Sequence, residues 1–484
     1  MQKNYTKNFS VLALLVVLFT NLDAKAMEII NCNSVDCIQN AVSNAKPGDE
    51  IIIAPGTYNF RLTDKIPGAF GRAAYLYSNK NGTKDAPIIL RGADANNKPT
   101  IKGADYNDGY LFGLEGNYWV IKNIEFRTGS KGVILDNADF TQLENLEIHD
   151  VGEEALHFRH GTTNSTATGC FIHDTGRNPG KTDFGEGIYI GSDRSVHNLD
   201  YNVEGSEVYC QQWKRNQGRC GRFYNPFVND ITIKDCVVGP NVTAEHIDVR
   251  EGAHNVYITN NTFDAAGIIN KDFQDSFIDV KSSFTYIDGN TFNQNGATSI
   301  KKGIQVLDRD NGEDLIELTA YNNVISNNTF NMDDTTTPIL TYFQKRNYKS
   351  DNYAYNNVRN PSGTLFQSGS DFTEGIEPDF SNITGFEVGN QDSELAAATL
   401  STRDFPKNTL SFSVTPNPVN DIISINTTEV ITSVKVYNLQ GQNIMSINAN
   451  QNSNKINLSE LRPGVYIIAV KTVSNFGTEM IYKL

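Results

Sequence analysis

A short phrase recurs along the middle of the chain, and it is the feature that most limits which folds are open to the sequence. Clear copies are Tyr257-Ile-Thr-Asn-Asn-Thr-Phe263, Tyr286-Ile-Asp-Gly-Asn-Thr-Phe292 and Val324-Ile-Ser-Asn-Asn-Thr-Phe330. Each copy is typical of two short strands joined by a bend, because Asn and Gly tolerate the left-handed backbone of a sharp turn. Five asparagines are predicted to share this bend as a hydrogen-bonded ladder: Asn123, Asn145, Asn261, Asn290 and Asn328.

A second phrase precedes the later copies of the first. Its copies are Glu154-Ala-Leu-His-Phe-Arg159, Glu186-Gly-Ile-Tyr-Ile-Gly191, Glu245-His-Ile-Asp-Val-Arg250, Ser276-Phe-Ile-Asp-Val-Lys281 and Lys302-Gly-Ile-Gln-Val-Leu307. Because side chains alternate along a strand, one aliphatic position of each copy should point inward: Leu156, Ile188, Ile247, Ile278 and Ile304. Coils of roughly 22 to 38 residues that stack like residues on like residues describe an all-β solenoid.

Two further motifs lie near the start of the chain, Asp36-Cys-Ile-Gln-Asn-Ala-Val42 and Lys46-Pro-Gly-Asp-Glu-Ile-Ile-Ile-Ala-Pro-Gly-Thr-Tyr58. Together with the coils, they resemble the pectin-lyase-like right-handed parallel β-helix superfamily, which includes polysaccharide lyases. The resemblance covers about residues 28 to 380. It implies a capping helix followed by a single-stranded right-handed parallel β-helix, which we assign to residues 27–389.

The N-terminus has the layout of a cleavable signal peptide. Lys3 and Lys7 precede an apolar run, and Ala24-Lys25-Ala26 offers small residues at a cleavage site. Residues 1–26 are therefore predicted to be removed. No later segment reaches the roughly 18–20 apolar residues that a spanning helix needs, so we expect no transmembrane segment.

The C-terminus carries a different pattern. Residues 390–409 are polar and are assigned to a linker, and a compact β pattern fills residues 410–484, for which we expect a small β-sandwich-like domain. Val414-Thr-Pro-Asn-Pro-Val419, Val434-Lys-Val-Tyr-Asn-Leu-Gln-Gly-Gln442 and Leu458-Ser-Glu-Leu-Arg-Pro-Gly-Val-Tyr-Ile-Ile468 resemble the type A sorting domain of type IX secretion cargo. The resemblance implies passage through the periplasm, contact with the type IX secretion machinery, and a secreted or surface-attached product. The alternative is a small carbohydrate-binding β-sandwich.

Six cysteines in an exported chain are disulfide candidates. Their spacing predicts two local pairs, Cys32 with Cys37 and Cys210 with Cys220. Cys170 and Cys236 form either a third bridge or two buried thiols stacked in one column. The net charge of −15 argues against nucleic acid as a partner, and we expect a monomer.

Alignment of the second phrase brings chemically active side chains into columns. Outward residues of successive coils lie about 4.8 Å apart. The first column is His157, Tyr189, Asp248, Asp279 and Gln305, and the second is Arg159, Gly191, Arg250, Lys281 and Leu307. Glu154, Glu186 and Glu245 lie at the bend before the strand. Acidic and basic groups are thus predicted to converge around residues 245–281.

This patch has the groups that β-elimination of a uronic-acid polymer requires. Such cleavage needs a base for the proton alpha to the carboxylate, a positive charge on that carboxylate, and a proton for the leaving oxygen. Lys281 or Arg250 is the candidate base or neutraliser, and His157 and Tyr189 are further catalytic candidates. Glu245, Asp248 and Asp279 are predicted to hold Ca²⁺, as the superfamily resemblance implies in type. The alternative is ordinary surface ion pairing, and Lys281, as an outward side chain, is expected to contribute little to the core.

A long insertion between Gly191 and Ile231 is basic and aromatic. It contributes the substrate-binding candidates Trp213, Lys214, Arg215 and Arg222, which add to Arg159. Aromatic faces suit sugar rings and Arg suits carboxylates, so an anionic polysaccharide is the predicted partner. The alternative is a stabilised surface hairpin.

The sequence thus predicts a secreted lyase acting on a pectate- or alginate-like polysaccharide. Three alternatives remain open at this point. An epimerase would use nearly the same proton abstraction, a glycoside hydrolase would need a positioned pair of carboxylic acids, and an adhesin would only bind glycan.

Overall fold

The computed structural model describes residues 28–68, 72–192, 228–268, 275–308, 320–343, 351–370 and 372–378, and most of residues 412–483. The predicted signal peptide (1–26) and linker (390–409) lie outside these residues. The chain forms two compact units, Met1–Gly389 and Asn390–Leu484.

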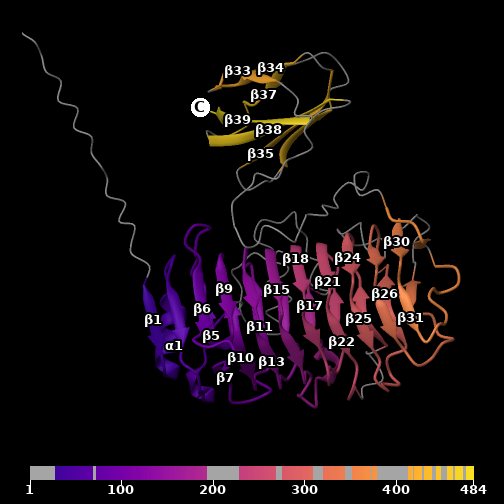
Figure 1. Ribbon diagram of the computed structural model, residues 1–484. Coiled ribbons are helices and arrows are strands. Elements are labelled where there is room, and N and C mark those ends of the chain that lie inside the picture. Colours follow the sequence, from indigo (N-terminus) through magenta and orange to yellow (C-terminus); the bar gives the residue numbers. More distant parts are fainter. Residues whose placement is uncertain are drawn as a thin grey trace, which may run out of the picture. The chain divides into compact units, whose positions relative to one another are not determined.

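The first unit is a parallel β-helix whose described strands form three long sheets (Figure 1). The first sheet contains, in spatial order, β1 (Ile29–Cys32), β2 (Glu50–Ile53), β6 (Ile88–Gly92), β9 (Trp119–Lys122), β12 (Gln142–Glu144), β15 (Thr163–Thr168), β18 (Val228–Lys234), β21 (Ala253–Thr259), β24 (Thr285–Asp288), β27 (Val324–Ser326), β30 (Asn352–Tyr355) and β32 (Phe372–Glu374). All neighbouring pairs of this sheet are parallel, since each coil returns the chain to the same face.

The second sheet contains β3 (Thr57–Asn59), β7 (Thr100–Lys102), β10 (Glu125–Arg127), β13 (Glu147–His149), β16 (Phe171–His173), β19 (Val237–Val238), β22 (Thr262–Asp264), β25 (Thr291–Asn293), β28 (Thr329–Asn331) and β31 (Val358–Asn360). The third contains β4 (Ile66–Pro67), β5 (Ala73–Ser78), β8 (Tyr110–Leu114), β11 (Lys131–Asp136), β14 (Leu156–Arg159), β17 (Ile188–Ile190), β20 (Ile247–Val249), β23 (Ser276–Val280), β26 (Lys302–Leu307) and β29 (Leu340–Phe343). The all-β, β-helical fold class predicted from the repeats is therefore confirmed.

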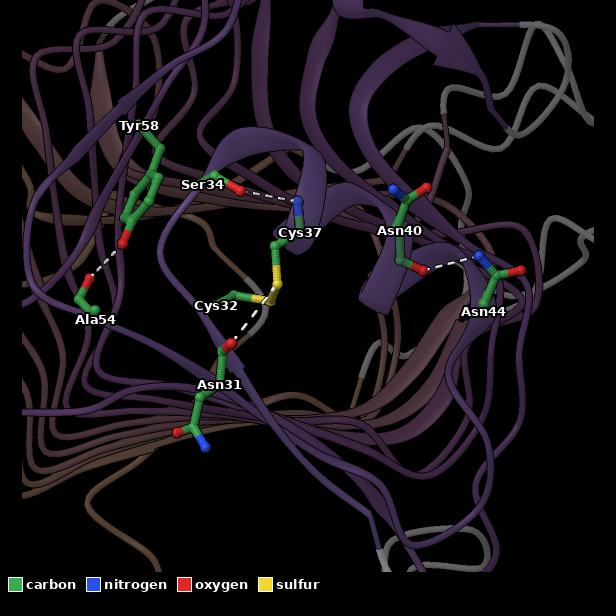
Figure 2. Close-up of a disulfide and its surroundings, with 8 residues drawn as sticks. All are labelled: Asn31, Cys32, Ser34, Cys37, Asn40, Asn44, Ala54 and Tyr58. Atoms are coloured by element: carbon green, nitrogen blue, oxygen red, sulfur yellow. Dashed lines mark hydrogen bonds between the residues drawn. A yellow bond between two sulfur atoms is a disulfide. The ribbon is translucent and has the colours of Figure 1, made fainter.

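Helix α1 (Val35–Asn44) lies at the N-terminal end of the stack, beside β1 (Figure 1). Ser34 begins it as the N-cap, accepting a hydrogen bond from the Cys37 N–H at 3.3 Å. A disulfide joins Cys32 at the end of β1 to Cys37 in the first turn of α1, so this predicted pair is confirmed (Figure 2). Ile38 and Val42 of the helix are fully buried in the core of the β-helix. The helix therefore covers the apolar end of the first coils.

The interior is filled by aligned aliphatic and aromatic side chains. Leu156, Ile188, Ile247, Ile278 and Ile304 are consecutive partners in the third sheet and have no exposed surface. In the second sheet, Phe263, Phe292 and Phe330 stack on one another with centroids 4.8 and 4.5 Å apart. The predicted inward column is confirmed.

The five asparagines lie in one bend, as predicted, but they occupy two neighbouring positions of it, so the prediction of a single ladder was wrong. Asn123 and Asn145 have left-handed backbone and bond to each other at 2.8 Å. Asn261, Asn290 and Asn328 lie one residue further along the bend, are buried, and form their own ladder with side-chain bonds of 3.0 Å. The shift arises because Asn123 aligns with Asn260 in the repeated phrase, not with Asn261.

Cys170 and Cys236 are buried and are not bridged. The Cys170 N–H donates to the Cys236 sulfur at 3.4 Å. Of the two alternatives, a third disulfide or two stacked buried thiols, the structure shows the stacked thiols.

The second unit consists, in its described residues, of two small antiparallel sheets. One contains β33 (Ser413–Thr415), β34 (Ile422–Asn426) and β37 (Lys455–Asn457), and the other contains β36 (Asn443–Asn448), β35 (Ile431–Asn438), β38 (Gly464–Thr472) and β39 (Phe476–Lys483). Val414 and Ile423 from one sheet and Val436 and Ile468 from the other share a single buried cluster. Within the described parts of both units, no helix is long and apolar enough to span a membrane.

Candidate active site

The outward face of the third sheet carries the charged columns that the repeated phrase predicted. Strand register aligns His157 with Tyr189, Tyr189 with Asp248, and Asp248 with Asp279. Arg250 and Lys281 come two residues after Asp248 and Asp279, and each directly follows its strand, β20 or β23, on adjacent coils. We call the outward side chains of β14, β17, β20 and β23, with the residues that flank these strands, the charged face.

Lys281 lies between the two aligned aspartates. Its Nζ atom is 2.6 Å from Asp248 Oδ1 and 3.1 Å from Asp279 Oδ2. Burial lowers the pKa of Lys281, but the charges of Asp248 and Asp279 outweigh burial and raise that pKa above its ordinary value. The repulsion expected between the two carboxylates is therefore offset by a cation of the chain itself.

Arg250 is the second cation of the charged face. Its Nη1 atom donates to Asp248 Oδ2 at 3.0 Å, and its Nε atom is 3.2 Å from Glu251 Oε2. The guanidinium carbon lies 5.6 Å from the centroid of the Tyr189 ring, within cation–π range. Asp248 thus receives both Lys281 and Arg250, one on each carboxylate oxygen.

The charged side chains of this network are far more buried than we expected for side chains that point outward from a solenoid. Asp248, Lys281 and Arg250 retain only 2, 3 and 7 % of their surface. The expectation that the Lys281 side chain contributes little to the core is therefore wrong, because it forms a buried ion-pair network. Tyr189 is only half-buried, which makes it a group of this network that solvent reaches.

His157 packs against Tyr189, with ring centroids 4.5 Å apart. Its Nε2 atom lies 2.9 Å from the Gly191 carbonyl oxygen, and its Nδ1 atom lies 3.2 Å from Glu154 Oε1. Burial lowers the pKa of His157 despite that carboxylate. Burial also raises the pKa of the Tyr189 hydroxyl well above its ordinary value, against the charge of Arg250.

Arg159, the last residue of β14, joins the charged face to the preceding coil. Its Nε and Nη2 atoms donate to the two oxygens of Asp136 at 2.5 and 3.1 Å, a bidentate pair. The same guanidinium lies 5.5 Å from the Tyr110 ring centroid. Arg159 is therefore held in one orientation at the edge of the charged face.

Three carboxyl groups converge beside the cations. The side-chain oxygens of Glu186, Glu245 and Asp248 lie within 4.8 Å of one another, and Glu186 Oε2 is buried without a hydrogen-bond partner among the described residues. Burial, helped by the charge of Glu154, raises the pKa of Glu186 to about 8. Burial likewise raises the pKa of Asp248 to about 7, against the charge of Lys281. We call these three residues the acidic trio.

The acidic trio differs from the predicted calcium ligands by one residue. Glu245 and Asp248 were predicted, whereas Glu186 takes the place that we gave to Asp279. Asp279 instead accepts from Ser276 Oγ at 2.6 Å and binds Lys281. A set of three carboxylates with an unsatisfied buried oxygen fits a hard cation such as Ca²⁺.

Sequence reasoning missed Lys131, which supports the other end of the charged face. Its ammonium binds Glu154 and lies 3.2 Å from Glu153 Oε2. The sequence did contain a signal for Lys131. Strand register aligns Ile134 with His157, and Lys131 and Glu154 each lie three residues before these positions, so Lys131 and Glu154 align on neighbouring coils. The loop candidates Trp213, Lys214, Arg215 and Arg222, and the predicted Cys210–Cys220 pair, lie outside the described residues.

The β-helix is similar to a known family of right-handed β-helices. Residues 23–200 match the family model described as a Pel9A-like, right handed beta helix region, and residues 413–483 match a secretion system C-terminal sorting domain. The β-helix is thus similar to the Pel9A-like family over residues 23–200, and the C-terminal unit is similar to a sorting domain of type IX secretion, in agreement with the two resemblances that the sequence predicted. That domain indicates secretion or cell-surface attachment.

Two relatives carry the comparison further. Pectate lyase L of Dickeya chrysanthemi is 29% identical over 141 residues, which are 28% of this chain and 31% of that protein. The chain thus spans less than a third of this curated relative. An alginate lyase from Paenibacillus sp. str. FPU-7 is 29% identical, with a TM-score of 0.58, over 72% of this chain and 99% of that structure.

Proposed function

We propose that this protein is a secreted lyase that cleaves a uronic-acid-containing polysaccharide, alginate-like or pectate-like, by β-elimination. The observation that carries the proposal is the pair of buried cations, Lys281 and Arg250, beside the half-buried Tyr189. The alginate lyase from Paenibacillus sp. str. FPU-7 supports the choice of substrate class, since its match covers 72% of this chain and 99% of that structure.

The two cations supply the charge that the reaction needs. Loss of the proton alpha to a uronate carboxylate leaves negative charge on that carboxylate, and preorganised cations stabilise it most where water is excluded. Lys281 is held as an ammonium between Asp248 and Asp279, so we assign Lys281 and Arg250 to neutralisation. The sequence left Lys281 open as the base, and its two carboxylate contacts disfavour that role.

The proton transfers are assigned to the Tyr189 hydroxyl. As phenolate it takes the C5 proton, the C4–O bond breaks as the C4=C5 bond forms, and the same hydroxyl returns the proton to the leaving oxygen. Arg250 favours the phenolate that burial opposes, so the rate should rise with pH. Both ring nitrogens of His157 are already bound, which makes His157 a positioning residue for Tyr189.

The use of one group for both proton transfers limits which uronate residues the enzyme can cleave. It serves both steps only when the C5 proton and the C4 oxygen lie on the same face of the ring. Mannuronate and glucuronate meet this condition, whereas galacturonate and guluronate present the two on opposite faces. The account therefore ranks mannuronate-rich alginate and glucuronan ahead of pectate.

The acidic trio is the proposed calcium site. Glu186, Glu245 and Asp248 would hold the ion, and bound calcium would add positive charge next to the substrate carboxylate. Isothermal titration with CaCl₂ tests this assignment, because Glu186→Gln should weaken calcium binding and Asp279→Asn should weaken it less.

A substrate panel tests the function. We expect the mature chain to release unsaturated uronate ends, detected by their ultraviolet absorbance, from at least one of mannuronan, glucuronan, guluronan and pectate. Tyr189→Phe should abolish this release while the variant still binds the polymer. Reducing ends without the absorbance would instead mean hydrolysis, and binding without either signal would mean an adhesin.

A further inference from the structure

A pair of histidines lies on the outward face of the second sheet, on a different sheet from the charged face. The tripeptide Ile-His-Asp occurs twice, at residues 148–150 and 172–174. Register pairs His149 with His173 on adjacent strands, while Ile148 and Ile172 point into the core. The two rings stack with centroids 4.6 Å apart and planes 12° from parallel.

Each ring is oriented by the aspartate that follows it. His149 Nδ1 lies 3.0 Å from Asp150 Oδ2, and His173 Nδ1 lies 2.6 Å from Asp174 Oδ2. A carboxylate only accepts, so Nδ1 carries a proton in both rings and Nε2 is the atom left for other chemistry. Metal-binding histidines usually have this arrangement, with the other ring nitrogen donating to a carboxylate.

The two aspartates are themselves fixed. Arg177 binds Asp174 and lies 3.4 Å from Asp150 Oδ1, so one guanidinium bridges both carboxylates. Asn241 also donates to Asp174 Oδ1 at 2.9 Å. The ring orientations therefore rest on a second layer of contacts.

The Nε2 atom of His173 faces Glu147. His173 Nε2 is buried and has no hydrogen-bond partner among the described residues, and it lies 3.6 Å from Glu147 Oε1. One ligand atom from each of Glu147, His149 and His173 lies within 4.8 Å of the others. Tetrahedral zinc places its nitrogen and oxygen ligands roughly 3.4 Å apart, so small side-chain rotations suffice.

We propose that Glu147, His149 and His173 form a site for a borderline divalent transition metal, with Zn²⁺ as the representative ion. Two imidazoles and one carboxylate are a donor set that such ions prefer, whereas calcium prefers oxygen alone. The fourth position is open to water, because the side chains of His149, His173 and Glu147 remain 11, 14 and 32 % exposed.

Metal binding replaces an existing contact. His149 Nε2 lies 3.0 Å from Glu125 Oε1, so this nitrogen also carries a proton before the ion binds. The ion displaces that proton to solvent, and Glu125 keeps its bond from Thr100 at 2.8 Å and its contact with Arg127. The bound ion links β13 to β16 and so clamps two adjacent coils.

Titration of the untagged, chelator-stripped mature chain with ZnCl₂ tests the proposal. We expect one zinc per chain at this site, and a higher thermal unfolding midpoint with zinc. Asp174→Asn should weaken zinc binding by roughly 10–100-fold, the usual effect of losing an outer hydrogen-bond partner. His173→Asn should weaken it further, and Glu147→Gln, at the most exposed ligand, keeps the test valid if a histidine variant misfolds.

Two controls separate this site from other sources of zinc binding. His254→Asn removes a histidine of β21 in the first sheet, and Glu186→Gln alters the acidic trio. Neither should change the affinity of the histidine site. Unchanged zinc affinity in a folded His149→Asn/His173→Asn double variant, or no zinc binding by the parent chain, would overturn the proposal.

Discussion

Two regions of the same β-helix use the repeated coil in opposite ways. In the ladder region, Asn261, Asn290 and Asn328 place the same side chain on successive coils, and each amide bonds to the next. On the charged face, aligned positions carry Tyr189, Asp248 and Asp279 in turn. Repetition in a solenoid therefore marks stabilising positions, and departure from repetition marks positions free to carry chemistry.

The two regions also differ in how their polar groups are satisfied. The ladder is neutral and closed, since each asparagine donates to a backbone carbonyl and accepts from a neighbouring coil. The charged face buries ions whose partners lie on other coils, and Glu186 Oε2 has no partner among the described residues. A buried polar atom left unpaired is costly unless a ligand or function explains it.

The largest effect is expected from Lys281→Met. The variant should lose activity by about 10²–10³-fold or more, because a cation at the developing negative charge is removed. It should also lose about 3–5 kcal/mol of unfolding free energy, because Asp248 and Asp279 stay buried without their shared cation. Initial rates and urea unfolding measure the two quantities.

Lys302→Met is the matched control for that change. Lys302 lies on β26 of the same sheet and binds Asp275 at 2.6 Å, but the aspartate side chain is 50 % exposed. A surface pair contributes at most about 1 kcal/mol, so this variant should remain close to the parent in stability. Equal losses in both variants would remove the distinction between the charged face and ordinary surface ion pairs.

Asn290→Ala should give the second largest effect, on stability alone. The change leaves the Asn261 N–H and the Ile258 carbonyl without their partners at 2.8 Å. Each unsatisfied buried group costs roughly 1–3 kcal/mol, so we expect a loss of about 3 kcal/mol with activity retained. Asn331→Ala, which removes an outward asparagine contact at 2.7 Å, should cost less. A larger loss of activity than of stability in Asn290→Ala would break the division between the regions.

The smallest effect is the contribution of one histidine, His160 beside the charged face, to the pH dependence of stability. Burial, with the charges of Arg159 and His157, lowers the pKa of His160 well below 6.5, and Asp136 lies 3.6 Å away. As pH falls from 6.5 to 5.5, the unfolded chain takes up a proton that folded His160 does not. The free energy of unfolding should fall by roughly 1 kcal/mol over this step.

The His160→Gln variant isolates that contribution. Urea unfolding at both pH values should give a smaller pH difference for the variant than for the parent. Asn290→Ala should keep the parental pH difference, because the ladder has no titrating group. An unchanged difference in His160→Gln would show that this histidine is not the source.

The fold was predictable because each coil repeats one local solution. The aliphatic positions of Ile188, Ile247 and Ile278 followed from side-chain alternation alone, and all three are buried partners. The bend was less predictable, since Asn123 and Asn261 lie in similar phrases but differ by one position. A shift of one residue along a bend changes whether the amide points inward.

The sequence predicted which site residues align on successive coils, but it did not predict which side chains contact each other. Register reasoning aligned Asp248 with Asp279, as observed. It did not show that Lys281 lies between them, because side-chain direction across a column depends on rotamers and burial. It also missed that Glu186, which it aligned with Glu245 at the bend, approaches Asp248, since Glu186 and Asp248 come from different columns as well as different coils.

The most direct test of the central claim is the mass of the products that the mature chain releases from mannuronate-rich alginate. Elimination gives oligosaccharides whose new ends are one water lighter than those from hydrolysis. We predict these unsaturated products from the parent chain, at least about 100-fold less of them from Lys281→Met, and none from Tyr189→Phe. Saturated products, or unsaturated products formed equally well by both variants, would contradict the account of the charged face.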